Sequence, residues 1–292
     1  MVAGRSRPEI IAVVGQTASG KSRLAMRIAK DFNGEIIAAD SWTVYKGFDI
    51  GTSKASEKEQ KEVRHRLLDV VEAPKGFNAP KFQELANAAI KDIHNRGKLA
   101  VLAGGTGLYV DSVLYDFGFL PNLGASQRAA LDAMELSELI SLADDEKLDL
   151  SGIDTRNKRR VIRAIEAGGQ QPTRGELRPD AIIIGLKLDN DELRQQIEKR
   201  VDTMLVAGLE REVKALSKKY GWDIEPMKGI GYKEWREYFQ GTQDLAQTRQ
   251  RVISGTMNLA KRQRTWSKRN PDIQWFGSID DAYVYVAQRM NN

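Results

Sequence analysis

Short apolar runs alternate with amphipathic stretches through the N-terminal third of the chain. Helical patterns, in SRLAMRIAKDF and in residues 81–95, lie between apolar runs that are too short for helices. The apolar runs are IIAVV (10–14), EIIAAD (35–40), LLDVV (67–71) and LAVLAGG (99–105). Such alternation is typical of βαβ units, so the pattern predicts an α/β fold in which helices cover both faces of a parallel sheet.

Residues 120–178 follow a different pattern, because they are mostly polar and rich in helix formers. They include SQRAALDAMELSELISLADDEKLDL and a basic helix, RNKRRVIRAIEAGG, which ends at a Gly-Gly pair. The run AIIIGLKL (181–188) returns to a strand pattern, and helical periodicity dominates from Asp191 onward. We therefore expect a small helical insertion domain at 120–178, within an α/β core made of residues 1–119 and 179–292 with C-terminal helices.

The composition excludes several classes of site and of protein. The chain has 292 residues, 45 Lys and Arg against 40 Asp and Glu, and no cysteine. This composition excludes disulfides and thiolate zinc sites, and His65 and His94 alone cannot form a three-histidine site. No apolar run approaches the roughly 18 residues that span a bilayer, and MVAGRSRPE is too short and too polar for a signal peptide. We expect a cytoplasmic protein without a membrane partner, and a monomer by default.

The stretch GQTASGKS follows the first apolar run directly and has the spacing G-x-x-x-x-G-K-[ST] of a phosphate-binding loop. Glycine lets the backbone approach an anion, and successive N–H groups at a helix N-terminus supply partial positive charge. Lys21 is expected to reach terminal phosphate oxygens, and Ser22 to place its hydroxyl on Mg²⁺. The residues expected to bind the phosphates are Gly15, Gln16, Thr17, Ala18, Ser19, Gly20, Lys21 and Ser22.

A typical ATPase or GTPase also has an apolar strand that ends in an acid. The run LAVLA ends instead in GGTG (104–107), whereas EIIAAD ends at Asp40. Asp40 is therefore a candidate metal partner or a general base aimed at a second substrate, and a structural turn residue is the third interpretation. We expect Thr106 to face the same crevice as Lys21 and Asp40.

Further motifs follow this loop in a fixed order along nearly the whole chain. The set is GQTASGKS, AADSWTVYKGFDIGTSK, AGGTGLYV, NKRRVIRAIE, RVDTMLVAGLEREVKAL, GIGYKEW and AKRQRTW. Taken together, these motifs resemble the tRNA dimethylallyltransferases, also called tRNA isopentenyltransferases, from about residue 10 to residue 276. The zinc finger of the eukaryotic members is missing, so the chain is similar to the bacterial form.

The resemblance implies a prenyl transfer. The loop would hold the diphosphate of dimethylallyl diphosphate, and the five-carbon group would move to N6 of the adenosine 3′-adjacent to the anticodon in tRNA, with Mg²⁺ assisting. It further implies that Asp40 takes the N6 proton, that Thr106 lies near the bridging oxygen, and that Lys21 and Arg200 bind the diphosphate. Fixed donors of this kind stabilise charge on a departing oxygen.

The resemblance also gives the basic segments a role in binding the anticodon stem-loop. In RNKRRVIRAIE, residues 156, 160 and 163 are expected on one helix face with 159 beside them, although such a run is more often a solvated surface. In KRQRTWSKR (261–269), cations next to Trp266 suit phosphate contact and base stacking, and a buried Trp266 is the alternative. The residues implied in tRNA binding are Asp40, Ser41, Trp42, Thr43, Thr106, Arg128, Arg159, Arg160, Arg163, Lys228, Tyr232, Lys233, Lys261, Arg262, Gln263 and Trp266.

The chain departs from the family pattern at several positions. Trp42 and Thr43 stand where Met and Gln are common, and Met257 and Leu259 stand where Arg and Tyr are frequent. The change at Trp42 and Thr43, beside Asp40, could alter which base is selected. The change at Met257 and Leu259 weakens the expectation of tRNA contacts at the start of the last basic helix. His65 is followed by Arg66 where the family often has two histidines, and we expect His65 to be structural.

Other functions share parts of the pattern. One is a cytokinin-type enzyme that prenylates free AMP, ADP or ATP, and the basic segments argue against it. Another is a small-molecule kinase on the same core, which the missing acid after LAVLA disfavours. A third is a nucleic-acid-binding protein that uses the loop only for folding, for which loss of Asp40 would change nothing measurable.

Overall fold

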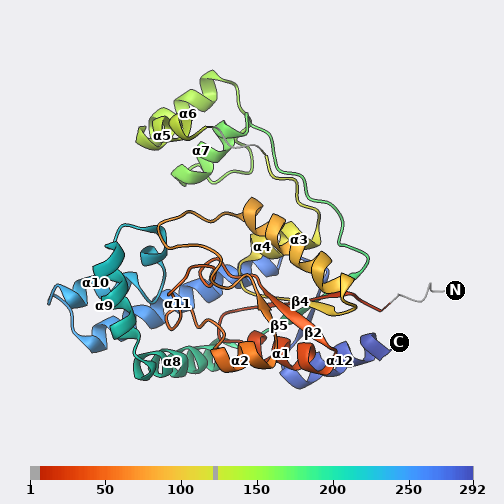
Figure 1. The fold of residues 1–292 in the computed structure, drawn as a ribbon. Coiled ribbons are helices and arrows are strands. Elements are labelled where there is room, and N and C mark those ends of the chain that lie inside the picture. Colours follow the sequence, from red (N-terminus) through yellow and green to blue (C-terminus); the bar gives the residue numbers. More distant parts are fainter. Residues whose placement is uncertain (1–6, 121–123, 292) are drawn as a thin grey trace. The chain divides into compact units, whose positions relative to one another are not determined.

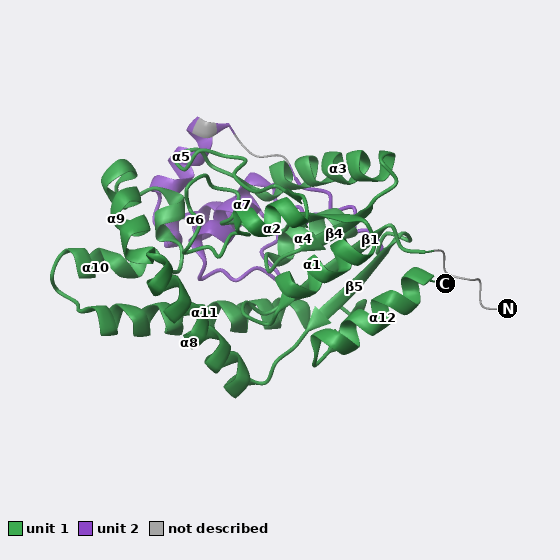
Figure 2. Cartoon of the chain, turned by 60° about the horizontal axis from the view of Figure 1, so that its bottom comes forward, with its two compact units in different colours: residues 1–114, 177–292 green, residues 115–176 purple. Residues whose placement is uncertain are grey.

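The computed structural model describes residues 7–120 and 124–291. The chain divides into two compact units: unit 1 comprises Met1–Leu114 and Leu177–Asn292, and unit 2 comprises Tyr115–Glu176 (Figure 2). Unit 2 thus begins several residues before the expected insertion at 120–178. The reason is that the segments leading into and out of it pair with each other, through a bridge between Gly118 and Thr173 and through the Gly175 N–H, which donates to the Tyr115 carbonyl at 2.7 Å.

Unit 1 contains a six-stranded sheet with strand order β3-β2-β4-β1-β5-β6 (Figure 1). Every strand pair is parallel, which confirms the predicted α/β fold. The strands are β1 (Ile10–Gly15), β2 (Gly34–Ala38), β3 (His65–Arg66), β4 (Leu99–Ala103), β5 (Ala181–Leu186) and β6 (Ile273–Phe276). Since β1, β2 and β4 are neighbours, their carboxyl ends meet at one edge of the sheet.

Helices cover both faces of the sheet (Figure 1). On one face, α1 (Lys21–Asp31) and α12 (Ile279–Asn291) bury Leu24, Ile28 and Val286 against alternate strand residues such as Ile11 and Val101. On the other face, α3 (Ala79–Asn95) packs against β4, and α11 (Leu245–Ser267) packs against β1. The other helical segments of unit 1 are α2 (Glu57–Glu62), α4 (Gly107–Leu114), α8 (Asn190–Ala207), α9 (Leu209–Tyr220), η1 (Glu225–Lys228), η2 (Lys233–Trp235) and α10 (Arg236–Phe239).

The prediction of a strand at 67–71 is wrong. The edge strand β3 ends at Arg66, and Leu67 and Asp69 adopt left-handed backbone with φ of 64° and 54°. Extended pairing cannot continue through such a conformation. The apolar side chains of this stretch instead belong to a loop, in which Val71 forms an isolated bridge with Tyr45.

A second apolar cluster holds the loop that follows β2. Val44, Tyr45 and Phe48 are buried against α9 and against the segment that contains Tyr232 and Trp235. The loop is therefore part of the packed interior although it has little regular structure. This packing fixes the chain on the carboxyl side of Asp40.

Unit 2 is a small three-helix body formed by α5 (Ala125–Ala133), α6 (Leu136–Asp145) and α7 (Lys158–Glu166). Its own core includes Leu139, Ala143, Val161 and Ile162, which are buried completely. The apolar side of α7 thus faces this core, which leaves its arginines on the remaining sides of the helix.

A buried carboxylate ties β2 to its neighbours in unit 1. The Glu35 side chain is 2% exposed and forms ion pairs with Arg66, Arg96 and Lys98. Arg66 and Arg96 also share Asp92 on α3. Hydrogen bonds from Arg96 and Arg66 lower the pKa of Glu35 to about 2, against the opposing effect of burial.

Replacing Glu35 should destabilise the protein. Glu35→Ala removes the buried partner of the partly exposed Arg66 and Arg96, which keep only Asp92 in common, and should lower the free energy of unfolding by about 1–3 kcal/mol. Because the folded pKa is depressed, this stabilisation is present above the unfolded value of 4.5 and is lost as the pH falls toward 2. Denaturant unfolding from pH 7 to pH 3 measures both effects, with Glu84→Ala, in an exposed pair with Lys81, as the control. Equal stability of the two variants would contradict the interpretation.

Candidate functional site

The phosphate-binding loop connects β1 to α1. Gly15 has φ of 140°, and a Cβ there would lie 2.4 Å from the Leu186 carbonyl oxygen, so no larger residue fits. Gly20 has φ of 90° and starts α1 with left-handed backbone. Gln16, Thr17 and Ser19 are buried inside the loop, and the buried Ser19 hydroxyl has no hydrogen-bond partner. The loop is a compact cradle with a polar interior.

Two cations lie at the mouth of this loop. The Lys21 Nζ donates to the Gln16 carbonyl at 2.7 Å, and Arg200 on α8 donates from Nη1 to the Thr17 hydroxyl at 3.1 Å. Burial, and then the charge of Arg200, lower the pKa of Lys21 to about 8, while Asp40 opposes the shift. Burial also lowers the pKa of Arg200, again against Asp40. A bound anion such as diphosphate would stabilise the charged forms of both side chains.

Asp40 follows β2 and Thr106 follows β4, and their backbones are held together. The Ser41 N–H donates to the Thr106 hydroxyl at 3.1 Å, and the Trp42 N–H donates to the Asp40 Oδ1 at 2.8 Å. A Cβ on Gly104 would lie 2.0 Å from the Ala39 carbonyl oxygen, so the GGTG turn passes directly against the end of β2. Asp40 is thereby fixed beside the two cations with part of its surface accessible.

A cavity of about 200 Å³ joins these groups. Its polar lining includes Thr17, Lys21, Ser22, Asp40 and Arg200, and its apolar lining includes Met26, Ile36, Leu68, Val201 and Leu259. Thr106 does not itself line the cavity, and its hydroxyl instead positions the backbone next to Asp40. A site with two cations, the carboxylates of Asp40 and Glu59 and an apolar wall can bind an anion that carries a hydrocarbon group.

Several residues expected to contact tRNA form hydrogen bonds within unit 1. Gln263 on α11 accepts the Thr17 N–H at 2.7 Å, and so supports the phosphate loop. The Trp266 indole covers Gly107 and donates from Nε1 to Asp111 at 3.1 Å, and the residue is half-buried, between the two alternatives of an exposed and a buried tryptophan. Tyr232 is 1% exposed and donates its hydroxyl to Glu212.

The two residues after Ser41 face the reaction cavity. Thr43 is buried, its hydroxyl has no partner, and Trp42 lines the cavity next to Asp40. Of the other departures from the family pattern, Leu259 also lines the cavity, whereas Met257 packs against the apolar cluster between α8 and α11.

The remaining basic candidates lie on the surface of their own unit. In unit 1 these are Lys228, Lys233, Lys261 and Arg262, which are exposed. In unit 2, Arg159 and Arg160 are exposed on α7, while Arg128 and Arg163 both pair with Glu166. Arg156 was expected on the same helix face, but α7 begins at Lys158, so Arg156 precedes the helix and pairs with Asp154.

Other cavity residues were missed or given another role. Residues 51–53 and Gly231 line the cavity, and so does His65, which was expected to be only structural. Burial lowers the pKa of His65, whose Nδ1 lies 2.8 Å from the Val63 carbonyl oxygen. Residues 51–53 and Gly231 lie in two of the quoted motifs, but those motifs do not indicate that the fold brings these loops together at one cavity.

The cavity offers oxygen ligands that fit Mg²⁺. The Ser22 hydroxyl and the Asp40 carboxylate both line it. Mg²⁺ usually binds few protein oxygens and keeps waters or substrate phosphates as its other ligands. Among the described residues, the cluster of histidine and carboxylate groups that could hold a metal lies elsewhere, at Glu9, His94 and Asp180, near the amino ends of β1 and β5.

No helix within residues 7–120 and 124–291 is both long enough and apolar enough to cross a membrane.

Comparison with known proteins gives consistent matches over nearly the whole chain. A family model described as IPP transferase matches residues 43–270. The chain is 38% identical over 284 residues to a tRNA dimethylallyltransferase of Anoxybacillus flavithermus, covering 94% of this chain and 91% of the relative. It is 40% identical over 276 residues to a tRNA dimethylallyltransferase of Streptococcus pneumoniae, covering 92% of each.

Solved structures agree with these matches. The tRNA isopentenylpyrophosphate transferase of Bacillus halodurans aligns with a TM-score of 0.74 at 33% identity, covering 97% of both chains. A eukaryotic dimethylallyltransferase acting on tRNA aligns with a TM-score of 0.77 at 25% identity, covering 96% of this chain and 77% of that one.

The charge state of Lys21 should control anion binding. Below a pH of about 8 the amine is protonated, and above it the neutral amine no longer attracts an anion. The affinity for inorganic pyrophosphate, corrected for the titration of pyrophosphate itself, should fall above pH 8 with a slope that approaches about tenfold per pH unit. Calorimetric titration from pH 6.5 to pH 9.5 measures this fall. Lys21→Arg stays charged over the range and should flatten it; an equal fall in this variant would contradict the assignment.

Proposed function

This chain belongs to the IPP transferase family, and from that premise we propose that it transfers the dimethylallyl group of dimethylallyl diphosphate to N6 of the adenosine 3′-adjacent to the anticodon in tRNA. One observation carries the proposal: Lys21, Arg200 and Asp40 face one cavity that also has an apolar wall. The cations suit the diphosphate, the apolar wall suits the prenyl group, and the carboxylate suits proton removal. The relatives and solved structures described above support the same reaction.

The proposed reaction is a substitution at the prenyl carbon. A bond forms between N6 and that carbon, the carbon–oxygen bond to the diphosphate breaks, and its electron pair leaves with the diphosphate. Lys21, Arg200 and the loop amides stabilise the charge that develops on the departing oxygen. Asp40 accepts the N6 proton, because an adenine amine is a weak nucleophile whose lone pair is delocalised into the ring.

We further propose Mg²⁺ as the cofactor. The Ser22 hydroxyl would hold the ion. Asp40 lines the same cavity, and one of its two carboxylate oxygens would be a second ligand for the ion. When bound, Mg²⁺ would neutralise part of the diphosphate charge. The apolar wall of the cavity would orient the prenyl group, and Asp40 would accept the proton.

The acceptor adenosine must leave its stack to reach Asp40, at a cost of a few kcal/mol. Trp42, Thr43 and Leu259 line the cavity, where they would contact the inserted base. Exposed cations of each unit, such as Arg160 in unit 2 and Lys261 in unit 1, would bind phosphates of the anticodon stem. We propose a monomer, because the residues that line the cavity belong to unit 1 of one chain and need no second chain to complete them, and the use of tRNA in translation supports a cytoplasmic site of action.

The kinase alternative has less support. Of the two strands that flank β1, β4 leads into Gly104 rather than into an acid, and Asp40 follows β2 instead. An assay that offers both tRNA and ATP as acceptors distinguishes prenylation of tRNA from prenylation of free adenine nucleotide.

Loss of the carboxylate should stop the transfer. Asp40→Asn removes the proton acceptor with little change in size and should lower kcat by about 10²–10⁴-fold. The measurement follows labelled dimethylallyl diphosphate into unmodified tRNA and into ATP, with Asp31→Asn on the surface of α1 as the matched control. Label in tRNA supports the proposed function, label only in ATP selects the free-nucleotide enzyme, and near-normal turnover by Asp40→Asn would remove Asp40 from the role of base.

Removal of one exposed cation from unit 2 should weaken tRNA binding. Arg160→Gln should raise the Kd for tRNA and reduce the slope of log K against log salt by about 1, because one phosphate contact is lost. Filter binding between 50 and about 200 mM salt measures the slope. Arg156→Gln, outside the helix and already paired with Asp154, is the control. If both variants bind like the unmodified protein, α7 does not contact tRNA.

A further inference from the structure

One wall of the reaction cavity is formed by loop backbone. Residues 51–53 and Gly231 line the cavity, and we call these four residues the loop wall. Its two parts lie against each other, since a Cβ on Gly231 would be 3.3 Å from the Gly51 carbonyl oxygen. A Cβ on Gly51 would lie 2.5 Å from the Tyr232 ring, so the wall has no space to move in that direction.

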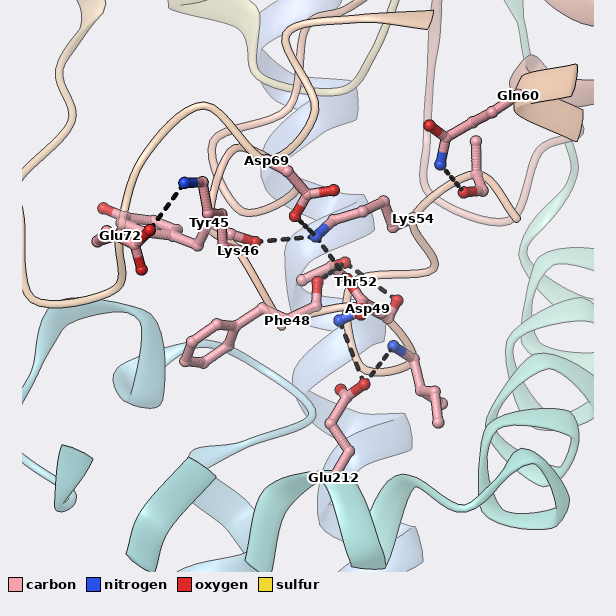
Figure 3. A network of polar contacts seen from close by, with 12 residues as sticks. Tyr45, Lys46, Phe48, Asp49, Thr52, Lys54, Gln60, Asp69, Glu72 and Glu212 are labelled. Carbon is pink, nitrogen blue, oxygen red and sulfur yellow. Dashed lines mark hydrogen bonds and ion pairs between the residues drawn. The ribbon is translucent and has the colours of Figure 1, made fainter. Parts of the chain in front are cut away.

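The carboxylate of Glu212, which does not line the cavity, is hydrogen-bonded to the backbone of the 51–53 part of the wall and of the residues before it (Figure 3). Glu212 on α9 accepts the backbone N–H groups of Asp49, Ile50 and Gly51 at 3.2, 2.8 and 3.0 Å. The Tyr232 hydroxyl donates to the same carboxylate at 2.7 Å. An ionised carboxylate is an acceptor only, so it satisfies all these donors at once, and such charge-assisted bonds are stronger than neutral ones.

A buried lysine closes the same loop from its other end. The Lys54 side chain is 4% exposed, and its ammonium donates to Asp49 at 2.5 Å, to Asp69 at 2.6 Å and to the Tyr45 carbonyl at 2.8 Å (Figure 3). An ammonium has three N–H donors, so its hydrogen-bonding capacity is filled. Within the loop, the Thr52 hydroxyl donates to the Phe48 carbonyl at 2.7 Å. The loop wall is thus held by side chains as well as by its own turns.

The Gly231 part of the wall has an anchor of its own. Glu234 is 4% exposed and accepts the Gly231 N–H at 2.9 Å. Burial raises the pKa of Glu234. Each half of the loop wall therefore rests on one acidic residue that does not line the cavity, the half-buried Glu212 or the buried Glu234.

We propose that Glu212 is a positioning residue for the transfer, which acts by fixing the loop wall opposite Lys21 and Arg200 without touching either substrate. The inference rests on the proposed function, because it concerns the geometry of that reaction. Alignment of reacting groups is sensitive to small displacements, and a shift of about 1 Å can cost about 100-fold in rate. A carboxylate that holds successive backbone amides sets the position of the wall more tightly than apolar packing does.

Glu212→Gln is the decisive variant, because it keeps the size of the side chain and replaces one oxygen with an NH₂ group that faces N–H donors. Glu210→Gln is the matched control: it lies two residues away on α9, and its carboxylate accepts the Tyr238 hydroxyl at 3.3 Å. Both variants are assayed well below their unfolding midpoints, with saturating tRNA and dimethylallyl diphosphate. We expect kcat to fall by about 10–100-fold in Glu212→Gln and to stay unchanged in Glu210→Gln.

Amide hydrogen exchange tests the anchor independently of turnover. Peptides that cover residues 46–56 should exchange about tenfold faster in Glu212→Gln, because an unsatisfied contact lowers the cost of local opening. This readout does not require catalysis. If the unmodified protein transfers no label, the proposed function fails while the exchange result still tests the anchor.

The outcomes separate positioning from a purely structural role. Faster exchange with normal kcat, or an increase in KM alone, would overturn the proposal, and so would unchanged exchange. Should Glu212→Gln fail to fold, Tyr232→Phe removes one donor from the same carboxylate and is expected to lower kcat by about threefold. Normal kcat in a folded Tyr232→Phe protein would then count against the proposal.

Discussion

The backbone pairing between β2 and β4 continues past the ends of both strands, and the site depends on it. The Ala39 N–H donates to the Ala103 carbonyl at 2.8 Å, and the Thr106 N–H returns to the Ala39 carbonyl at 3.2 Å. This pairing sets Asp40 at a fixed distance from the turn after β4, while β1 on the other side of β4 delivers the phosphate loop to the same edge. The parallel arrangement of three neighbouring strands therefore assembles the anion site and the carboxylate before any substrate is bound.

The electrostatic character of the cavity follows from that assembly. Lys21 and Arg200 are both desolvated, and each is stabilised in its charged form by Asp40. The two cations repel each other, because the charge of Arg200 lowers the pKa of Lys21. A bound diphosphate would offset this repulsion.

Sequence patterns predicted what depends on local spacing. The loop at GQTASGKS, the parallel sheet and the position of Asp40 at a strand end could all be read from short segments. The strand at 67–71 could not be excluded in this way, because left-handed backbone at Leu67 and Asp69 leaves no signature in the apolar pattern. The short edge strand β6 likewise has too few residues to distinguish it from a loop.

Residue roles were harder to predict than elements. The family resemblance implied that Tyr232, Gln263 and Trp266 bind tRNA, and the structure adds that a polar atom of each forms a hydrogen bond within unit 1. A basic helix exposes its long charged side chains and buries its aromatic and amide residues, and the sequence alone does not tell which of these face solvent. Glu212 shows the converse, since nothing near it in sequence indicates that it holds a loop more than a hundred residues away.

The contact between α11 and the GGTG turn constrains how this sequence can vary. Gly107 lies under the Trp266 indole, where a Cβ would come within 2.1 Å of the ring, and Gly105 lies equally close to the amide of Gln263. A side chain at 107 would therefore require the Trp266 ring to move, and one at 105 would displace the Gln263 amide, which accepts the Thr17 N–H of the phosphate loop. Two motifs more than 150 residues apart are thus coupled by packing, so a larger residue in the GGTG turn requires a change in α11 or in the support of the phosphate loop.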